Sequence, residues 1–267
     1  MVYNKRLILF ASMACIVIFL SVPLLAYQSS SAKPFPLELD HVFIWVTKGA
    51  PEAKALEDIG LRAFGEITHH TGQGTASKVF VFENAYLELI WVDDEQTATK
   101  NAARTGIDMK TRARWKQTGA SPFGVGLHYL PDKVNAAPFP VIKYWAEWMK
   151  PNTSIEFAQV VTTHREPMYF IVPDYLAVSD TVLREILLQN SSKVETERLD
   201  VKRITGARIT TVEKRVTSTA GMLTRNRVIT IEGGKAPVME LTFDGGKQGK
   251  VLDLRTKSDL RRLGHRQ

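Results

Sequence analysis

A carboxylate inside an apolar strand is the feature that most constrains how this chain can fold. Glu88 lies within residues 86–92, YLELIWV, whose β-branched and aromatic side chains favour a strand. Side chains alternate between the two faces of a strand, so Glu88 points the same way as Tyr86 and Ile90. An ionised carboxylate among apolar neighbours is costly unless a partner satisfies it. The fold must therefore bring a partner to Glu88, and a metal ion is one candidate.

The segment before this strand predicts two more strands joined by a tight turn. Residues 65–70 lead into Gly72 and Gly74, which permit the backbone angles of such a turn, and residues 75–83 follow as a strand. His70 opens the turn and is a candidate general base or substrate contact, because imidazole titrates near neutral pH. Capping of the hairpin is the alternative role. The turn is not a phosphate loop, since no helix N-terminus or lysine follows it.

A further strand and a helix come earlier in the chain. Residues 39–46 are apolar on both faces, with His41 on one of them, which is typical of a strand covered by a helix on one side and a cavity on the other. Residues 50–59 predict that helix, because Pro51 suits its first turn and Gly60 ends it. Together these elements form a β-α-β-β-β unit.

The second half of the chain shows the same order of elements with little sequence identity. Residues 122–129 predict a strand with one apolar face, and its other face leaves space for a cavity wall at Gly124, Gly126 and His128. A helix and three strands follow at 179–190, 203–213, 225–232 and 237–243. Glu240 lies inside the last of these strands, as Glu88 does in the first half. The sequence therefore predicts an α+β fold of two repeated modules, over 37–94 and 121–256.

Two segments do not fit the repeat. Residues 95–119 are polar and basic without clear periodicity, which indicates a connection over the surface. Residues 131–176 are interpreted as an insertion with a short helix over 141–150 and one extra strand over 167–172.

The N-terminal residues 1–36 are expected to be separate from the fold. Basic residues at 4–6 precede an uncharged run over 7–26, which is about the length of a helix that crosses a bilayer. This arrangement predicts a hydrophobic anchor helix with the soluble domain outside the cytoplasm, either periplasmic or extracellular. The alternative is a secreted protein, released by cleavage of a signal near residues 29–32.

Charge and cysteine content exclude two function classes. The net charge is +7, but 35 basic residues are spread among 28 acidic ones without a compact basic run, so no nucleic-acid partner is expected. Cys15 is the only cysteine, so the body has neither thiolate ligands nor a cysteine nucleophile. A basic tail over 257–267 ends the chain.

Four short motifs in this order carry a resemblance to a known family: Asp40-His41, residues 70–75 (HTGQGT), residues 86–90 (YLELI) and residues 121–124 (SPFG). Over about residues 37–256 the chain resembles a glyoxalase-like domain of the vicinal oxygen chelate superfamily. The resemblance implies paired βαβββ modules that close a cup-shaped mixed sheet. In metal-dependent members, the first and last strands of the modules supply His and Glu ligands to an ion that holds two substrate oxygens.

Carried onto this sequence, the resemblance implies that His41 and Glu88 are the metal ligands of module one and that Glu240 is a ligand from module two. Gly124 falls where the other histidine is expected, so His128 on the same strand face is a substitute rather than a match. Nitrogen and oxygen ligands suit Fe, Mn, Ni, Zn or Co. The alternative is that His41 and Glu88 hydrogen-bond to each other without a metal.

Two functions follow from this resemblance. One is an enzyme, a lyase, isomerase or dioxygenase, that acts on a small oxygenated substrate with a divalent metal as Lewis acid. The other is a metal-free protein that binds or sequesters a small molecule. The candidate catalytic residues are His70 and Glu240, and the candidate substrate contacts are Thr75, Tyr86, Gly124 and Gly126. Besides the small molecule, the expected partners are the membrane, through residues 1–36, and a second copy of the chain in a homodimer.

Overall fold

A computed structural model of the chain describes residues 34–131, 136–191, 201–247 and 251–254. The chain divides into two units, Met1–Pro34 and Phe35–Gln267, and the second unit carries the elements described below. Nearly all of the expected anchor segment and the whole basic tail lie outside the described residues, so the anchor and the exported location stay predictions. None of the described helices is both long and apolar enough to cross a membrane.

The first module folds as the sequence predicts. Its elements are β1 (Leu37–Trp45), α1 (Ala53–Asp58), β2 (Ala63–His70), β3 (Thr75–Val81) and β4 (Tyr86–Val92). β2, β3 and β4 are antiparallel neighbours, and β4 returns to pair in parallel with β1. The pairing places His41 opposite Tyr86 and Phe43 opposite Glu88. The first strand of the module and the strand that carries Glu88 are therefore side by side.

The second module comes from a segment that the sequence analysis placed elsewhere. Its strands are β5 (Phe123–Tyr129), β6 (Val141–Tyr144), β7 (Ile155–Ala158) and β8 (Met168–Ile171). They complete one eight-stranded sheet in the order β2-β3-β4-β1-β5-β8-β7-β6. β1 and β5 are antiparallel at its centre, and β8 is parallel to β5 as β4 is to β1. The segment 131–176 is thus mostly the second module itself, and the helix predicted over 141–150 is wrong because β6 pairs with β7.

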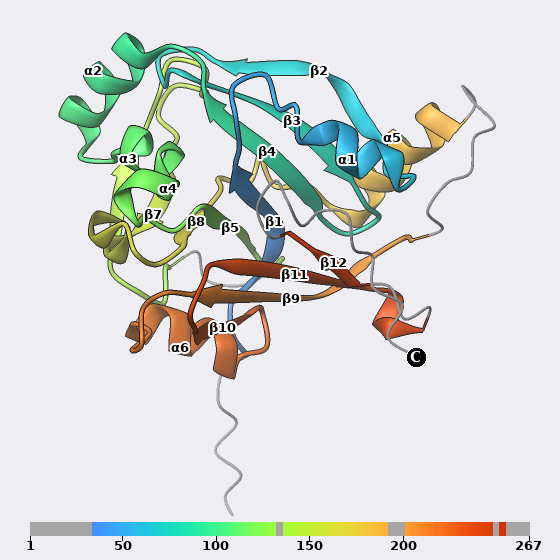
Figure 1. The fold of residues 1–267 in the computed structure, drawn as a ribbon. Coiled ribbons are helices and arrows are strands. Elements are labelled where there is room, and N and C mark those ends of the chain that lie inside the picture. The colour runs from blue at the N-terminus through green and yellow to red at the C-terminus, as the bar shows by residue number, and fades with distance from the viewer. Residues whose placement is uncertain (1–33, 132–135, 192–200, 248–250, 255–267) are drawn as a thin grey trace, which may run out of the picture. The chain divides into compact units, whose positions relative to one another are not determined.

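The C-terminal strands form a separate sheet. They are β9 (Ile204–Thr211), β10 (Thr230–Gly233), β11 (Val238–Phe243) and β12 (Val251–Asp253), in the order β10-β9-β11-β12. The helix predicted over 179–190 is confirmed as α5 (Asp180–Ser191), and an unpredicted helix, α6 (Ser218–Arg225), precedes β10. Figure 1 shows this four-stranded sheet as an addition below the eight-stranded one. The α+β class is confirmed, but the assignment of these strands to module two is wrong.

The eight-stranded sheet has a covered outer face and a covered inner face. On the outer face, side chains such as Val42, Leu87 and Val125 share one hydrophobic cluster with residues of α1 and of the four-stranded sheet. On the inner face, Phe43 and Phe170 belong to a second cluster. Both faces of β1 are therefore buried, as its sequence predicts, and the inner face is the one that carries His41 and Glu88.

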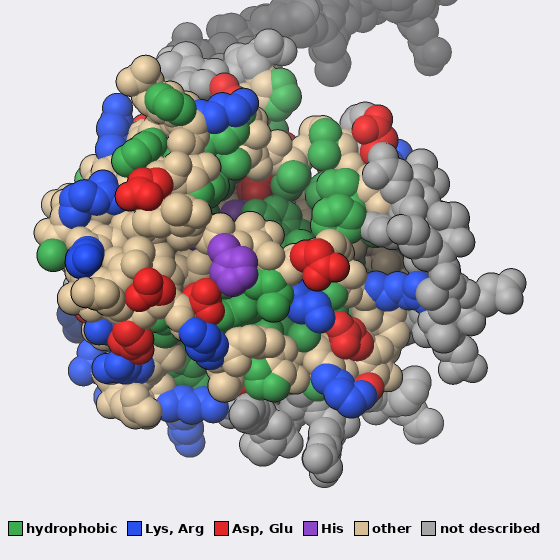
Figure 2. Space-filling view, turned by 90° about the horizontal axis from the view of Figure 1, so that it is seen from above, with side chains coloured by type: hydrophobic (Ala, Val, Ile, Leu, Met, Phe, Trp, Pro, Cys, Tyr) green, Lys and Arg blue, Asp and Glu red, His purple; other side chains and the backbone are tan. Residues whose placement is uncertain are grey.

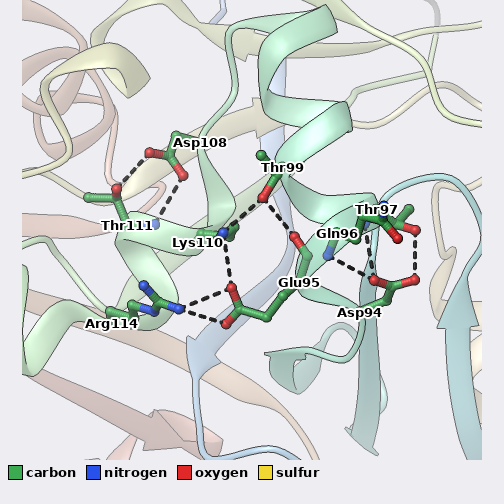
Figure 3. A network of polar contacts seen from close by, with 9 residues as sticks. All are labelled: Asp94, Glu95, Gln96, Thr97, Thr99, Asp108, Lys110, Thr111 and Arg114. Atoms are coloured by element: carbon green, nitrogen blue, oxygen red, sulfur yellow. Dashed lines mark hydrogen bonds and ion pairs between the residues drawn. The ribbon is translucent and has the colours of Figure 1, made fainter.

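The segment 95–119, predicted as an irregular connection, is helical. It contains α2 (Glu95–Thr105), α3 (Met109–Ala113) and α4 (Trp115–Thr118). The carboxylates of Asp94 and Asp108 accept hydrogen bonds from backbone N–H groups of the first turns of α2 and α3. Glu95 pairs with Lys110 and Arg114 at 3.0 Å, which joins α2 to the helices after it (Figure 3). Polar caps and ion pairs, rather than a long apolar stripe, hold these short helices.

A buried glutamate ties the C-terminal addition to the second module. Glu166 exposes 2% of its surface. Its carboxylate accepts hydrogen bonds from the backbone N–H of Thr217 at 2.5 Å, the Thr217 hydroxyl at 2.8 Å and the Tyr169 hydroxyl at 3.2 Å. Thr217 is also the N-cap of α6. One side chain therefore satisfies polar groups from β8 and from the start of α6.

We predict that Glu166→Ala lowers the free energy of unfolding by about 2–4 kcal/mol, because it leaves several buried donors without an acceptor. Urea denaturation followed by circular dichroism measures this change. Glu240→Ala is the matched control, since the Glu240 side chain is 40% exposed, and its effect should stay within about 0.5 kcal/mol. Equal effects of the two variants would contradict the role assigned to Glu166.

Candidate functional site

The inner face of the eight-stranded sheet encloses a cavity of about 310 Å³. Its walls are mainly aromatic and aliphatic side chains from β1, β3, β7, β8 and α5, including Phe43, Trp45, Val79, Phe157, Met168, Phe170, Leu183 and Ile186. Figure 2 shows a face of the molecule with a hollow, bordered by hydrophobic side chains, in which acidic and histidine side chains are recessed. The size and apolar lining are typical of a site for a small organic molecule.

Glu88 lies at the polar end of this cavity between two histidines. Its Oε2 is 3.9 Å from Nε2 of His41, and its Oε1 is 4.0 Å from Nε2 of His70. Glu88 exposes only 9% of its surface, and its carboxylate has no direct hydrogen bond among the described residues. The structure therefore brings together three predicted site residues, with gaps between them that are too wide for direct hydrogen bonds.

The orientation of His41 is set by Asp40. The β1–β5 register shifts between Leu39 and His41, so Asp40 is the extra residue of a β-bulge and its carboxylate lies beside the imidazole of His41. The Asp40 Oδ1 to His41 Nδ1 distance is 2.6 Å. Burial favours the neutral form of Asp40, but hydrogen bonds with His128 and His41 outweigh burial and lower its pKa to about 2. The ionised Asp40 accepts the His41 Nδ1–H, so Nε2 of His41 faces Glu88.

A second network positions His70. Nε1–H of Trp148 and the hydroxyl of Tyr144 donate to Oε1 of Gln73, so Nε2 of Gln73 donates to Oγ1 of Thr75 at 2.7 Å. Thr75 Oγ1 is in turn 2.9 Å from Nδ1 of His70. Burial lowers the pKa of His70, which keeps this imidazole neutral at physiological pH. Thr75 therefore contacts His70 and does not itself line the cavity.

Tyr86 completes the polar end. Its ring stacks on the imidazole of His41 with centroids 4.3 Å apart, and the side chain lines the cavity. Burial, followed by the charges of Asp40 and Glu88, raises the pKa of Tyr86 well above its ordinary value, so its hydroxyl stays protonated. The predicted position of Tyr86 at the site agrees with this geometry.

The predicted metal ligands do not form a metal site as placed. Neighbouring ligand atoms around one ion bound at about 2.1 Å are roughly 3–3.4 Å apart, which is less than both histidine–carboxylate distances around Glu88. In module two, β5 pairs with β8 as β1 pairs with β4 in module one, and Phe170 of β8 takes the position that Glu88 has in β4. The described residues of module two therefore supply no ligand at this position. Across the described ranges, no group of three or more His, Cys, Asp or Glu side chains is arranged to hold a metal ion.

Two predicted site residues lie away from the cavity. His128 faces the other side of Asp40, with Nδ1 3.1 Å from Oδ2 of Asp40 and Nε2 2.8 Å from Oε1 of Glu38. Glu240 lies on β11 in the four-stranded sheet, where its partly exposed carboxylate is 4.0 Å from Arg208 of β9. The predicted grouping of Glu240 and His128 with His41 and Glu88 is therefore wrong. Strand β11 alternates buried and half-buried residues, whereas β4 is buried on both faces.

Gly124 and Gly126 have a different role from the predicted one. They lie opposite Phe43 and His41 in the β1–β5 pair, and a Cβ added at either glycine would overlap the ring of its partner. These glycines leave the space that the two rings occupy, so they shape the inner face without lining the cavity. The sequence analysis correctly predicted the missing volume but not the side chains that fill it.

Several residues of the site were missed. Asp40 stood next to His41 in the sequence, but strand alternation predicts opposite faces for neighbours, and only the bulge overrides this. Gln73 was passed over as a turn residue although it is buried. The aromatic wall from β7 and β8 was missed because their segment was interpreted as an insertion.

The two pKa shifts around Asp40 predict a pH-dependent contribution to stability. Asp40 has a folded pKa of about 2, below its ordinary 3.8, so its contribution of about 2 kcal/mol is present above pH 4 and is lost as the pH falls through 2. For His128, burial is outweighed by Asp40 and Glu38, which raise its pKa above 6.5. Its contribution is therefore present below 6.5 and is lost as the pH rises through the folded value.

We therefore expect the difference in unfolding free energy between the wild type and Asp40→Asn to be largest at about pH 5 and smaller at both acidic and alkaline pH. Asparagine mimics the protonated carboxyl, so the variant lacks the Asp40 contribution and the part of the His128 contribution that Asp40 supplies. Urea denaturation across this pH range measures the difference. A constant difference at all pH values would contradict the assigned pairings.

Known proteins share parts of this architecture. Residues 39–128 match a family model described as a glyoxalase-like domain. Among solved structures, a hypothetical protein from Staphylococcus aureus matches with a TM-score of 0.45 and 14% identity, over 75% of this chain and 88% of its own. A mutant of 4-hydroxymandelate synthase from Streptomyces coelicolor matches with a TM-score of 0.34 and 12% identity, over 82% of this chain and 62% of its own. No curated protein matches the chain.

The matched residues begin in β1 and end in β5, so they include the first module, the bulge at Asp40 and the glycines opposite His41 and Phe43. They carry the motifs on which the resemblance was stated. Over residues 39–128 the chain is therefore similar to a glyoxalase-like domain.

Proposed function

We propose that the protein binds a small, largely apolar molecule in the cavity of the eight-stranded sheet and does so without a metal ion. The observation that carries this proposal is a cavity of about 310 Å³ whose apolar walls end at the carboxylate of Glu88, which has no direct hydrogen bond among the described residues. The walls supply affinity through the burial of apolar surface. The few polar groups at one end fix the orientation of the bound molecule.

The spacing around Glu88 supports the metal-free alternative. Both imidazole nitrogens lie farther from the carboxylate than adjacent ligands of one ion do, and Phe170 stands where a second module would supply its carboxylate. The lyase, isomerase or dioxygenase activity that the resemblance implies stays a prediction. The Asp40–His41 pair does leave an acceptor nitrogen facing the cavity, where it is able to take a proton from a bound molecule.

We predict that the purified full-length chain binds a neutral apolar dye such as Nile red, and that prior treatment with EDTA leaves its affinity unchanged. Trp45 and Trp148 line the cavity, so quenching of tryptophan fluorescence provides a second readout. A cavity-filling variant, Met168→Trp, should reduce dye binding. Absence of dye binding by the folded wild type would overturn the proposed function, and restoration of binding by added Fe, Mn, Ni, Zn or Co after EDTA would overturn its metal-free part.

A glycine variant tests whether the position of His41 matters for binding. Gly126→Ala should displace the His41 ring from the polar end and weaken binding of a ligand held there by about tenfold or more. Gly206→Ala in β9 is the matched control, because a Cβ there makes only ordinary contact with Thr242. Fluorescence titration of both variants gives the comparison. Equal affinities would show that His41 does not take part in binding.

A further inference from the structure

Glu88 and His41 offer hydrogen-bond acceptors at the polar end of the cavity. The carboxylate of Glu88 only accepts, and Nε2 of His41, held toward Glu88 by the contact of its Nδ1 with Asp40, accepts in the neutral imidazole. These two acceptors are 3.9 Å apart. A bound group that satisfies both of them must therefore supply at least two donors.

The electrostatics of the cavity favour a positive charge on that group. None of the described lining residues is Lys or Arg, and Glu88 exposes 9% of its surface, with no direct hydrogen bond to its carboxylate in the described part of the chain. The ionised carboxylate of Asp40 lies directly behind His41. A buried carboxylate in such surroundings is stabilised by a cation.

Aromatic rings surround the same position. Tyr86 stacks on His41, the ring of Phe170 lies 5.3 Å from the His41 ring, and the ring of Trp148 lies 5.3 Å from the His70 ring. The faces of aromatic rings attract cations, and a carboxylate set among such rings suits an ammonium group. An anionic group would face the carboxylate of Glu88 there.

We propose that the ligand of this cavity is a hydrophobic amine, whose protonated primary amino group lies between Glu88 and His41 while its apolar body fills the aromatic wall. This inference rests on the proposed function and names its ligand class. An ammonium nitrogen donates at about 2.9 Å in tetrahedral directions, so two acceptors that share it are roughly 4–5 Å apart. The 3.9 Å spacing is close to this range and wider than metal ligation requires.

A matched ligand series tests the proposal on the full-length chain. Naphthylethylamine, naphthylethanol and naphthylacetate share an aromatic body and differ in the charge of the polar end. Competition against Nile red ranks their affinities. We expect the amine to bind at least about tenfold more tightly than the alcohol, and the acetate to bind most weakly. In Glu88→Gln the advantage of the amine should disappear, while the affinity for the alcohol stays within about twofold.

Glu240→Gln is the control variant, because it removes a carboxylate of the other sheet and should keep the full preference for the amine. Retained alcohol and Nile red binding by Glu88→Gln shows that the variant cavity is folded. Equal affinity for amine and alcohol, or an unchanged preference in Glu88→Gln, would overturn the ligand class and leave the proposed function standing. Failure of the wild type to bind Nile red and all three probes would overturn both.

Discussion

Asp40 is buried in the bulge of β1, where its carboxylate meets three neighbours. It is hydrogen-bonded to Nδ1 of His41 and Nδ1 of His128, and it accepts a hydrogen bond from the backbone N–H of Val178. These contacts join β1, β5 and the segment that leads into α5, which lines the cavity. Ionisation of a buried carboxylate is costly, so Asp40 stays charged only while these partners are in place. The orientation of His41, and with it the polar end of the cavity, depends on this one side chain.

The central β1–β5 pair explains how a bulky inner face is accommodated. Of the rings that project inward from β1, His41 and Phe43 lie opposite two glycines on β5. The small residues let the rings lie over the partner strand instead of filling the cavity. The outer face of the same strands is closed by α1 and by the four-stranded sheet. Separate packing of the two faces leaves room on the inner one for a ligand.

The sequence allowed correct prediction of module one because its elements are short, contiguous and clearly bounded. Gly72, Gly74 and Gly60 mark where strands and the helix end, and alternation along residues 39–46 and 86–92 correctly predicted which side chains face inward. Module two failed for the opposite reason. Its strands β6 to β8 have four residues each and are separated by prolines and loops, so they carry little periodic signal. The prediction therefore assigned the longer C-terminal strands to the second module in their place.

The sequence by itself determined that a carboxylate and a histidine lie on the inward faces of neighbouring strands of module one, because alternation along a strand follows from backbone geometry. It also determined that two glycines of the strand over 122–129 leave space on one face. Only the tertiary structure decided that Glu88 and Glu240, which both lie within predominantly apolar strand sequences, have different surroundings. A strand buried on both faces and a strand with one face toward solvent differ in what packs against them, and those partners come from distant parts of the chain. The same holds for Asp40, whose bulge depends on the register with β5.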